Sequence, residues 1–215
     1  MQSKHNKALG EVLRRVGVVP VLTIASAEAG VALVRALVNG GLGVVEITLR
    51  TPVALAAIRR IRDELPDVLV GAGTVLTPEL GQQAIAAGAR FIVAPGMTPR
   101  LIEAAERWPV PFLPGAATAS EAMSLADMGY GLLKFFPAET IGGAAALKAL
   151  AAPLPDIAFC PTGGIDASNA ASYLALPNVA AVGGSWVAPA KLVEKADWTA
   201  ITALAEAAAA MRRRA

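Results

Sequence analysis

Residues 44–74 read VVEITLRTPVALAAIRRIRDELPDVLVGAGT, and this stretch decides the fold. It begins with a largely apolar run, Val44–Leu49, that does not alternate as a half-exposed strand would. Pro52 then suits the first turn of a helix, and that helix must end before Pro66. A second apolar run, Val68–Ala72, follows at once. The stretch therefore predicts a strand, a helix and another strand, with both strands covered on two faces as in a parallel sheet.

The same strand–helix unit repeats along the chain. Strands are expected at Val18–Ile24, Val44–Leu49, Val68–Ala72, Phe91–Ala94, Pro111–Leu113, Leu132–Phe136, Ile157–Cys160 and Val179–Val182. Helices are expected over Ala27–Val38, from Pro52, from Thr77, over Pro99–Arg107, from Thr118 or Ser120, and over Ile141–Leu150, Asp166–Leu176 and Asp197–Met211. Eight such units predict an α/β protein of the (β/α)8 TIM-barrel type, near its minimal length. An open doubly wound sheet is the alternative, but no GxGxxG motif follows the first strand.

The composition favours one folded domain over residues 1–215, with residues 1–10 as a flexible N-terminal segment. A chain that is 55% hydrophobic and 17% charged, with a mean hydropathy of +0.54, is too apolar to be disordered. The formal net charge of +2 gives no electrostatic footprint for nucleic acid. The basic run Arg212–Arg214 is expected to end a solvated helix.

Two apolar segments imitate membrane-directed sequences. Val16–Ala25 resembles a signal peptide, but Glu11 lies among the preceding basic residues and Pro20 interrupts the run. Ala167–Ala190 carries no charge, but its prolines, glycines and asparagines divide it into a helix, a turn and a strand. We therefore expect a soluble, cytoplasmic protein with no membrane partner.

The single cysteine and the single histidine exclude several kinds of chemistry. Cys160 rules out an intramolecular disulfide framework, fits a reducing compartment and is expected to fill the core. His5 lies in the polar N-terminal segment, so cysteine proteases, serine–histidine triads and histidine-based zinc sites are not expected. Any chemistry is left to lysine, carboxylates or a cofactor.

Two ionisable residues stand inside predicted strands. Lys134 is the only one of six lysines in a hydrophobic strand, and burial should lower its pKa toward the range that a Schiff-base nucleophile needs. Glu46 is the only carboxylate in a strand interior and could move protons as a general acid and base. The alternative is a purely structural Lys134–Glu46 ion pair.

Further unusual residues follow the predicted strands, at the end where a barrel places its active site. Arg50 could clamp a carboxylate or phosphate through its planar guanidinium, or could simply be a surface arginine at a helix start. The pairs Gly163–Gly164 and Gly183–Gly184, with Ser185, follow the seventh and eighth strands. Barrels bind phosphate there through backbone N–H groups, so a phosphorylated substrate is expected.

Five segments, in order along the chain, resemble the 2-keto-3-deoxy-6-phosphogluconate (KDPG) aldolases of the KHG/KDPG class I aldolase family. They are VVEITLRT (44–51), GAGTVL (71–76), LKFFPA (133–138), PTGGI (161–165) and GGSW (183–186). The resemblance implies a homotrimeric (β/α)8 aldolase of the Entner–Doudoroff type that needs no metal or cofactor. It implies that Lys134 forms a Schiff base with the substrate's C2 carbonyl and that Glu46 moves protons. The implied products are pyruvate and D-glyceraldehyde 3-phosphate.

The resemblance also implies the rest of the site. Arg50 and Thr74 would hold the pyruvate carboxylate. Pro95 and Phe136 would line the pocket, and Thr162 would contact the substrate. The phosphate would be held by Gly163, Gly164, Gly184 and Ser185. Activity on 4-hydroxy-2-oxoglutarate, and the choice between gluconate and galactonate stereochemistry, stay open.

Two other functional classes stay open as well. One is a non-catalytic or engineered trimeric assembly scaffold built on the same barrel. The other is a different phosphate-binding barrel, such as a sugar-phosphate isomerase. Lys134 in the middle of a strand argues against the isomerase, and the intact Lys134–Glu46 pair argues against the scaffold.

Overall fold

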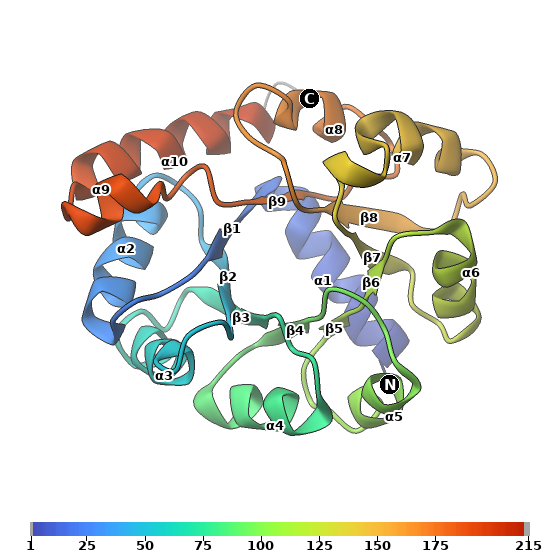
Figure 1. The fold of residues 1–215 in the computed structure, drawn as a ribbon, viewed down its shortest axis with the longest axis horizontal. Coiled ribbons are helices and arrows are strands. Elements are labelled where there is room, and N and C mark those ends of the chain that lie inside the picture. Colours follow the sequence, from blue (N-terminus) through green and yellow to red (C-terminus); the bar gives the residue numbers. More distant parts are fainter. Residues whose placement is uncertain (1, 213–215) are drawn as a thin grey trace.

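A computed structural model of the chain describes residues 2–212 and shows parallel strands curled around a centre, with helices outside them (Figure 1). One sheet has the order β5-β4-β3-β2-β1-β9 and the other has the order β6-β7-β8. The pairs between neighbouring strands within each sheet are parallel. The strands are β1 (Val18–Leu22), β2 (Val44–Thr48), β3 (Leu69–Gly73), β4 (Phe91–Val93), β5 (Phe112–Leu113), β6 (Gly115–Ala116), β7 (Leu132–Phe135), β8 (Ala158–Pro161) and β9 (Val182–Gly184). The predicted α/β class with parallel strands is confirmed.

Helices alternate with the strands, as the repeating unit predicts. They are α1 (Gln2–Val16), α2 (Ala27–Asn39), α3 (Ala54–Glu64), α4 (Pro78–Ala87), α5 (Pro99–Ala105), α6 (Ala119–Asp127), the short 3-10 helix η1 (Glu139–Ile141), α7 (Gly143–Ala151), α8 (Ala170–Leu174), α9 (Ala190–Glu194) and α10 (Trp198–Arg212). Ser26, Thr77, Thr98 and Thr118 cap helices whose first backbone N–H groups would otherwise lack partners. Local capping therefore places the start of each of these helices just after a strand.

The two sheets meet at two places. Only Pro114 separates β5 from β6, and its carbonyl accepts a hydrogen bond from the Lys134 backbone N–H at 2.9 Å. At the other side, isolated bridges join Phe159 to Val179 and Thr162 to Gly183. The fifth predicted strand, Pro111–Leu113, corresponds to β5, and β6 is a further short strand beyond Pro114, which has no N–H to donate to a ladder. The strands surround an interior whose carboxyl-terminal side carries the predicted site.

Buried side chains form two layers, one on each face of the curled sheet. The larger cluster lies between the sheet and the outer helices and includes Ile47, Ile58 and Phe159. The smaller cluster lies inside the sheet and includes Val19, Phe91 and Cys160. Both faces of the strands are covered, which explains why the strand sequences do not alternate.

The prediction that residues 1–10 are flexible is wrong. Residues 2–10 belong to α1, which lies across the centre of the curled sheet in Figure 1, and Met1 lies outside the described residues. Leu9 and Leu13 pack into the inner cluster, so α1 closes one side of the interior. Gln2 and Asn6 are 1% and 0% exposed and continue the same helix face. The helix is ordered because its buried stripe contacts the sheet along its whole length.

The buried polar residues of α1 complete the hydrogen bonds of strand ends. Asn6 donates to the carbonyls of Phe112 and Leu132, each at 3.0 Å, and accepts from the Leu132 N–H at 2.8 Å. Gln2 accepts from the Phe112 N–H at 3.0 Å and donates to the Ala105 carbonyl at 2.6 Å. Buried amides with partners such as these carry little penalty, which is why a polar sequence forms a buried helix here.

Other boundaries differ from expectation at the C-terminal end. The helix expected over Asp166–Leu176 is only α8, because Asp166, Ser168 and Asn169 form a hydrogen-bonded turn before it. The eighth strand comes later than expected, at β9, and α9 was not expected. Among the described residues, no helix is both long and apolar enough to cross a membrane. The expected end of the solvated helix falls partly outside the described residues, at Arg213 and Arg214.

Candidate active site

Lys134 and Glu46 meet inside the curled sheet, although 88 residues separate them. Lys134 lies in β7 and Glu46 in β2, and the Lys134 Nζ donates to Glu46 Oε1 at 3.2 Å. Both side chains are buried in a largely apolar interior, where each charge needs the other. The predicted pairing of the two ionisable strand residues is confirmed as a contact.

Glycines in β3 make room for this pair. A Cβ added to Gly73 would lie 1.9 Å from Glu46 Oε1, which no side chain at that position could tolerate. Gly71, two residues earlier on the same face, similarly leaves space for the ring of Phe91. Gly71 and Gly73 therefore leave room in the interior because neither residue has a side chain.

Thr48 supports the same region and was missed as a candidate. Its hydroxyl donates to the Leu22 carbonyl at 2.9 Å and pairs with the Thr23 hydroxyl at 3.1 Å. Thr48 is two residues from Glu46, so both side chains lie on the same face of β2. That period-two spacing is the sequence signal that identifies it.

Cys160 lies on β8 directly beside Lys134 in the parallel register. Burial raises the pKa of its thiol to about 12, although the Lys134 charge works in the opposite direction. A thiol with this pKa stays protonated and is a poor nucleophile. Cys160 therefore fills the core beside Lys134, as predicted.

Arg50 and Thr74 come together at the carboxyl ends of β2 and β3. The Arg50 Nε donates to Thr74 Oγ1 at 3.3 Å. Thr74 has a φ of 59°, a left-handed conformation that is costly for a β-branched residue. Strain of this kind persists only where the surroundings impose it, and it is frequent at functional sites.

Pro95 and Phe136 are half-buried and follow the ends of β4 and β7. Phe136 lies near the amine, with its ring centroid 5.5 Å from Lys134 Nζ. The Pro95 carbonyl passes so close to Gly115 that a Cβ there would lie 2.2 Å from its oxygen. Both residues therefore lie near the mouth of the interior, on the side where the sequence placed them.

The predicted phosphate-binding residues follow β8 and β9. Thr162 pairs with Gly183 across the two strands, and a Cβ on Gly183 would lie 2.4 Å from Thr162 Oγ1. Gly163 and Gly164 have φ values of 103° and 77°, which only glycine adopts without strain. The other two predicted phosphate-binding residues are Gly184, which is buried, and Ser185, which is exposed. The glycines of both turns are packed closely against neighbouring side chains, since a Cβ on Gly164 would lie 2.7 Å from Glu139 and one on Gly184 would lie 1.9 Å from the Trp186 ring.

Among residues 2–212, no group of three or more histidine, cysteine, aspartate or glutamate side chains is arranged to hold a metal ion. The chemistry that the described side chains can offer is that of an amine beside a carboxylate in a dry interior. An amine nucleophile with a neighbouring proton carrier is what Schiff-base catalysis requires.

Comparison with known proteins gives a consistent result. The family model described as KDPG and KHG aldolase matches residues 9–204. A 2-dehydro-3-deoxy-phosphogluconate aldolase of Pseudoalteromonas atlantica is 49% identical, over 90% of each chain. The KHG/KDPG aldolase of Escherichia coli K12 is 46% identical, over 95% of this chain and 97% of its own.

A solved structure has the same fold. It is the KDPG aldolase of Legionella pneumophila, with pyruvate captured as a covalent carbinolamine intermediate. Its TM-score is 0.90 at 45% identity, and the match covers 92% of this chain and 96% of that one. Together with the family model and the curated relatives, this similarity shows that the chain belongs to the KDPG and KHG aldolase family.

Proposed function

We propose that this chain is a class I aldolase that cleaves 2-keto-3-deoxy-6-phosphogluconate to pyruvate and D-glyceraldehyde 3-phosphate. The observation that carries the proposal is the buried contact between Lys134 Nζ and Glu46 Oε1 at 3.2 Å. It supplies an amine and a proton carrier at one point of an apolar interior. Membership of the aldolase family supports the same chemistry.

The reaction begins at the C2 carbonyl. The Lys134 amine adds to C2 to give a carbinolamine, which loses water to give a protonated imine. Glu46 moves the protons of these steps, through a water molecule, because its carboxylate is already within hydrogen-bond reach of the amine.

Bond cleavage uses the imine as an electron acceptor. Glu46 accepts the proton of the C4 hydroxyl, again through water, while the C3–C4 bond breaks and its electron pair forms an enamine. The C4 carbon leaves as the aldehyde of D-glyceraldehyde 3-phosphate. The enamine is protonated at C3, and water hydrolyses the imine to release pyruvate and the free amine of Lys134.

The remaining residues bind the substrate. Arg50 and Thr74 hold the carboxylate of the substrate. The hydrogen bond between them supports this role because it keeps the Arg50 guanidinium at the carboxyl ends of β2 and β3. Pro95 and Phe136 line the pocket, and Thr162 contacts the substrate. The phosphate is bound by backbone N–H groups and a hydroxyl at Gly163, Gly164, Gly184 and Ser185.

The fold proposed for this activity is a single domain with a closed (β/α)8 barrel. The bridges between β8 and β9, and the single residue between β5 and β6, support closure into eight strands. We further propose a cytoplasmic homotrimer, on the resemblance to the family, and a second activity on 4-hydroxy-2-oxoglutarate. A measured mass in solution of three chains would support the trimer, and a monomer would contradict it.

The scaffold and isomerase alternatives are not favoured. A scaffold needs no buried amine, and an isomerase of phosphorylated sugars has no use for a lysine that pairs with a carboxylate inside a strand. Neither the scaffold nor the isomerase gives the Lys134–Glu46 contact a chemical role.

The proposal is tested by following pyruvate release from the phosphorylated keto acid with a coupled lactate dehydrogenase assay. We expect steady turnover, and irreversible loss of that turnover when borohydride is added together with pyruvate but not with borohydride alone. No cleavage by a folded protein, or turnover that survives borohydride with pyruvate, would contradict it.

A further inference from the structure

A second polar contact to a carboxylate, between a buried tyrosine and an exposed glutamate, involves residues not considered so far. Tyr173, in α8, is 0% exposed, and its hydroxyl donates to Glu139 Oε1. Glu139 begins η1, five residues after Lys134. The contact therefore ties the segment that follows the lysine strand to a helix that follows β8.

Tyr173 is a permanent donor in this contact. Burial raises the pKa of its hydroxyl, and the hydrogen bond to Glu139 and the charge of that carboxylate raise it further. The phenol therefore stays protonated at every pH at which the enzyme works. A hydrogen bond from a neutral donor to a carboxylate is stronger than one between neutral groups, so the contact is a firm restraint.

The restrained segment holds the glycine turn that we propose binds phosphate. The Glu139 N–H donates to the Gly163 carbonyl at 3.1 Å, and the Ala138 N–H donates to the Thr162 carbonyl at 2.8 Å. A Cβ on Gly164 would lie 2.7 Å from Glu139 Cβ and Cγ, so the turn packs directly on this side chain.

The far end of the same turn is held from α8. Asn169, at the start of α8, donates to the Gly164 carbonyl at 3.0 Å. Tyr173 is four residues further along the chain. The α8 region therefore contacts the glycine turn through Asn169 and the segment at Glu139 through Tyr173. Both backbone carbonyls of Gly163 and Gly164 are thereby occupied, which fixes the orientation of the turn.

We propose that Tyr173 and Glu139 are positioning residues for the phosphate end of the substrate. Their contact fixes Gly163–Gly164 relative to Lys134, so that a phosphate bound at the turn places C2 within reach of the amine. This inference rests on the proposed aldolase function. It predicts that the pair affects ligands that carry a phosphate and leaves pyruvate, which has none, unaffected.

The test compares Tyr173→Phe, Glu139→Ala and Glu139→Gln with the unaltered chain. For Tyr173→Phe and Glu139→Ala we expect the KM for the phosphorylated keto acid to rise about ten-fold, with kcat within about two-fold. The inhibition constant of glycerol 3-phosphate should rise by the same factor. The pyruvate concentration that gives half-maximal borohydride trapping should not change. Glu139→Gln keeps an acceptor oxygen and should restore most of the lost affinity.

Tyr130→Phe is the matched control, because Tyr130 is a buried tyrosine whose hydroxyl has no hydrogen-bond partner. It should leave all four quantities unchanged. Glu139 is exposed, so its variants are expected to fold even if Tyr173→Phe does not. Unchanged KM in folded Glu139→Ala, or an equal loss of affinity for pyruvate, would overturn the positioning role. Failure of the unaltered chain to trap pyruvate would instead overturn the aldolase function itself.

Discussion

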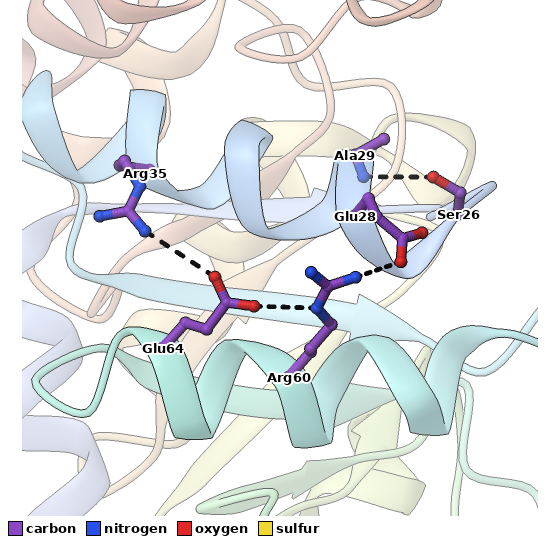
Figure 2. A network of polar contacts seen from close by, with 6 residues as sticks. All are labelled: Ser26, Glu28, Ala29, Arg35, Arg60 and Glu64. Atoms are coloured by element: carbon purple, nitrogen blue, oxygen red, sulfur yellow. Dashed lines mark hydrogen bonds and ion pairs between the residues drawn. The ribbon is translucent and has the colours of Figure 1, made fainter.

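Two sets of ion pairs in this molecule differ in almost every physical respect. Lys134 and Glu46 pair inside the curled sheet, with side chains 7% and 5% exposed. On the outer surface, a ladder joins α2 to α3: Glu28 and Glu64 both contact Arg60, and Arg35 lies 4.0 Å from Glu64 (Figure 2). Every side chain of the ladder is at least 39% exposed.

The comparison separates stability from chemistry. Water screens the ladder charges and would solvate them equally well apart, so the ladder contributes little to folding. The interior pair lost its water on folding, and its mutual attraction roughly offsets that loss. We propose that a pair that is costly to bury and gains little in stability is kept for its chemistry, that of an amine beside a proton carrier.

The sharpest way to break the comparison is to change the interior lysine. Lys134→Ala should lower kcat/KM by at least about 10³-fold, because the other described lysines are exposed and lie outside the interior. The coupled assay of pyruvate release measures this loss. Lys134→Arg keeps the charge opposite Glu46 but cannot form an imine, so it should be folded and equally inactive. Lys191→Ala, at an exposed lysine, should keep full activity, and an active Lys134→Arg enzyme would disprove the assignment.

Glu46→Gln should lower kcat by about 10²- to 10⁴-fold while still permitting a slow pyruvate adduct, because the amine remains but its proton carrier is lost. Single-turnover kinetics separates adduct formation from cleavage. Glu64→Gln makes the same chemical change in the surface ladder and should leave kcat unaltered. Equal effects of the two substitutions would remove the distinction between the two ion-pair regions.

Gly73→Ala tests whether space beside Glu46 is essential. The added Cβ would lie 1.9 Å from Glu46 Oε1, so the carboxylate or the strand must shift. Overpacking of this kind costs about 1–3 kcal/mol, and the displaced carboxylate should also reduce kcat. Gly43→Ala is the control, because nothing lies within 4 Å of a Cβ there. Chemical denaturation and the coupled assay measure the two effects, and an unaffected Gly73→Ala enzyme would refute this role.

Cys160 gives the interior a pH dependence at alkaline pH. Its thiol has a pKa of about 12 in the folded chain, raised from 9.0, so the unfolded chain loses this proton first as the pH rises. The stability contributed by the protonated thiol is therefore complete below about pH 9 and falls between about pH 9 and 12. Denaturant titrations at several pH values measure how the free energy of unfolding changes with pH. Cys160→Ala should remove the decrease between about pH 9 and 12, and an unchanged decrease would contradict the assignment. Iodoacetamide should label Cys160 in the unfolded chain well before the folded one.

Arg60→Ala should have the smallest effect. It breaks both ladder contacts of Arg60, yet Tm should fall by no more than about 2 °C, and less at high salt. Activity should be unchanged. Differential scanning calorimetry at low and high ionic strength measures this, and a large salt-independent loss would mean that the ladder supports the fold.

Much of the fold and the core of the site follow from sequence because each signal is local. The alternation of apolar runs with capped helices predicts the strands, and a charged residue inside an apolar run, such as Lys134, points to a function. Helix α1 escaped prediction because its buried stripe contains Gln2 and Asn6, whose burial depends on backbone carbonyls more than 100 residues away.

Other parts of the site depend on contacts that no local pattern encodes. The need for glycine at position 73 follows from the Glu46 side chain, which reaches from β2 over Gly73, although the register pairs Gly73 with Thr48. Tyr173 and Glu139 are 34 residues apart, and nothing in either segment alone indicates that they meet. Such features appear only once the chain has folded.

The central claim is that the buried amine of Lys134 carries the reaction. The most direct test is to reduce the enzyme with borohydride in the presence of pyruvate, digest it and map the modified peptide by mass spectrometry. The account predicts a reduced pyruvyl adduct on Lys134, absent from Lys134→Arg. A folded, active enzyme with no adduct, or with the adduct on another lysine, would contradict it.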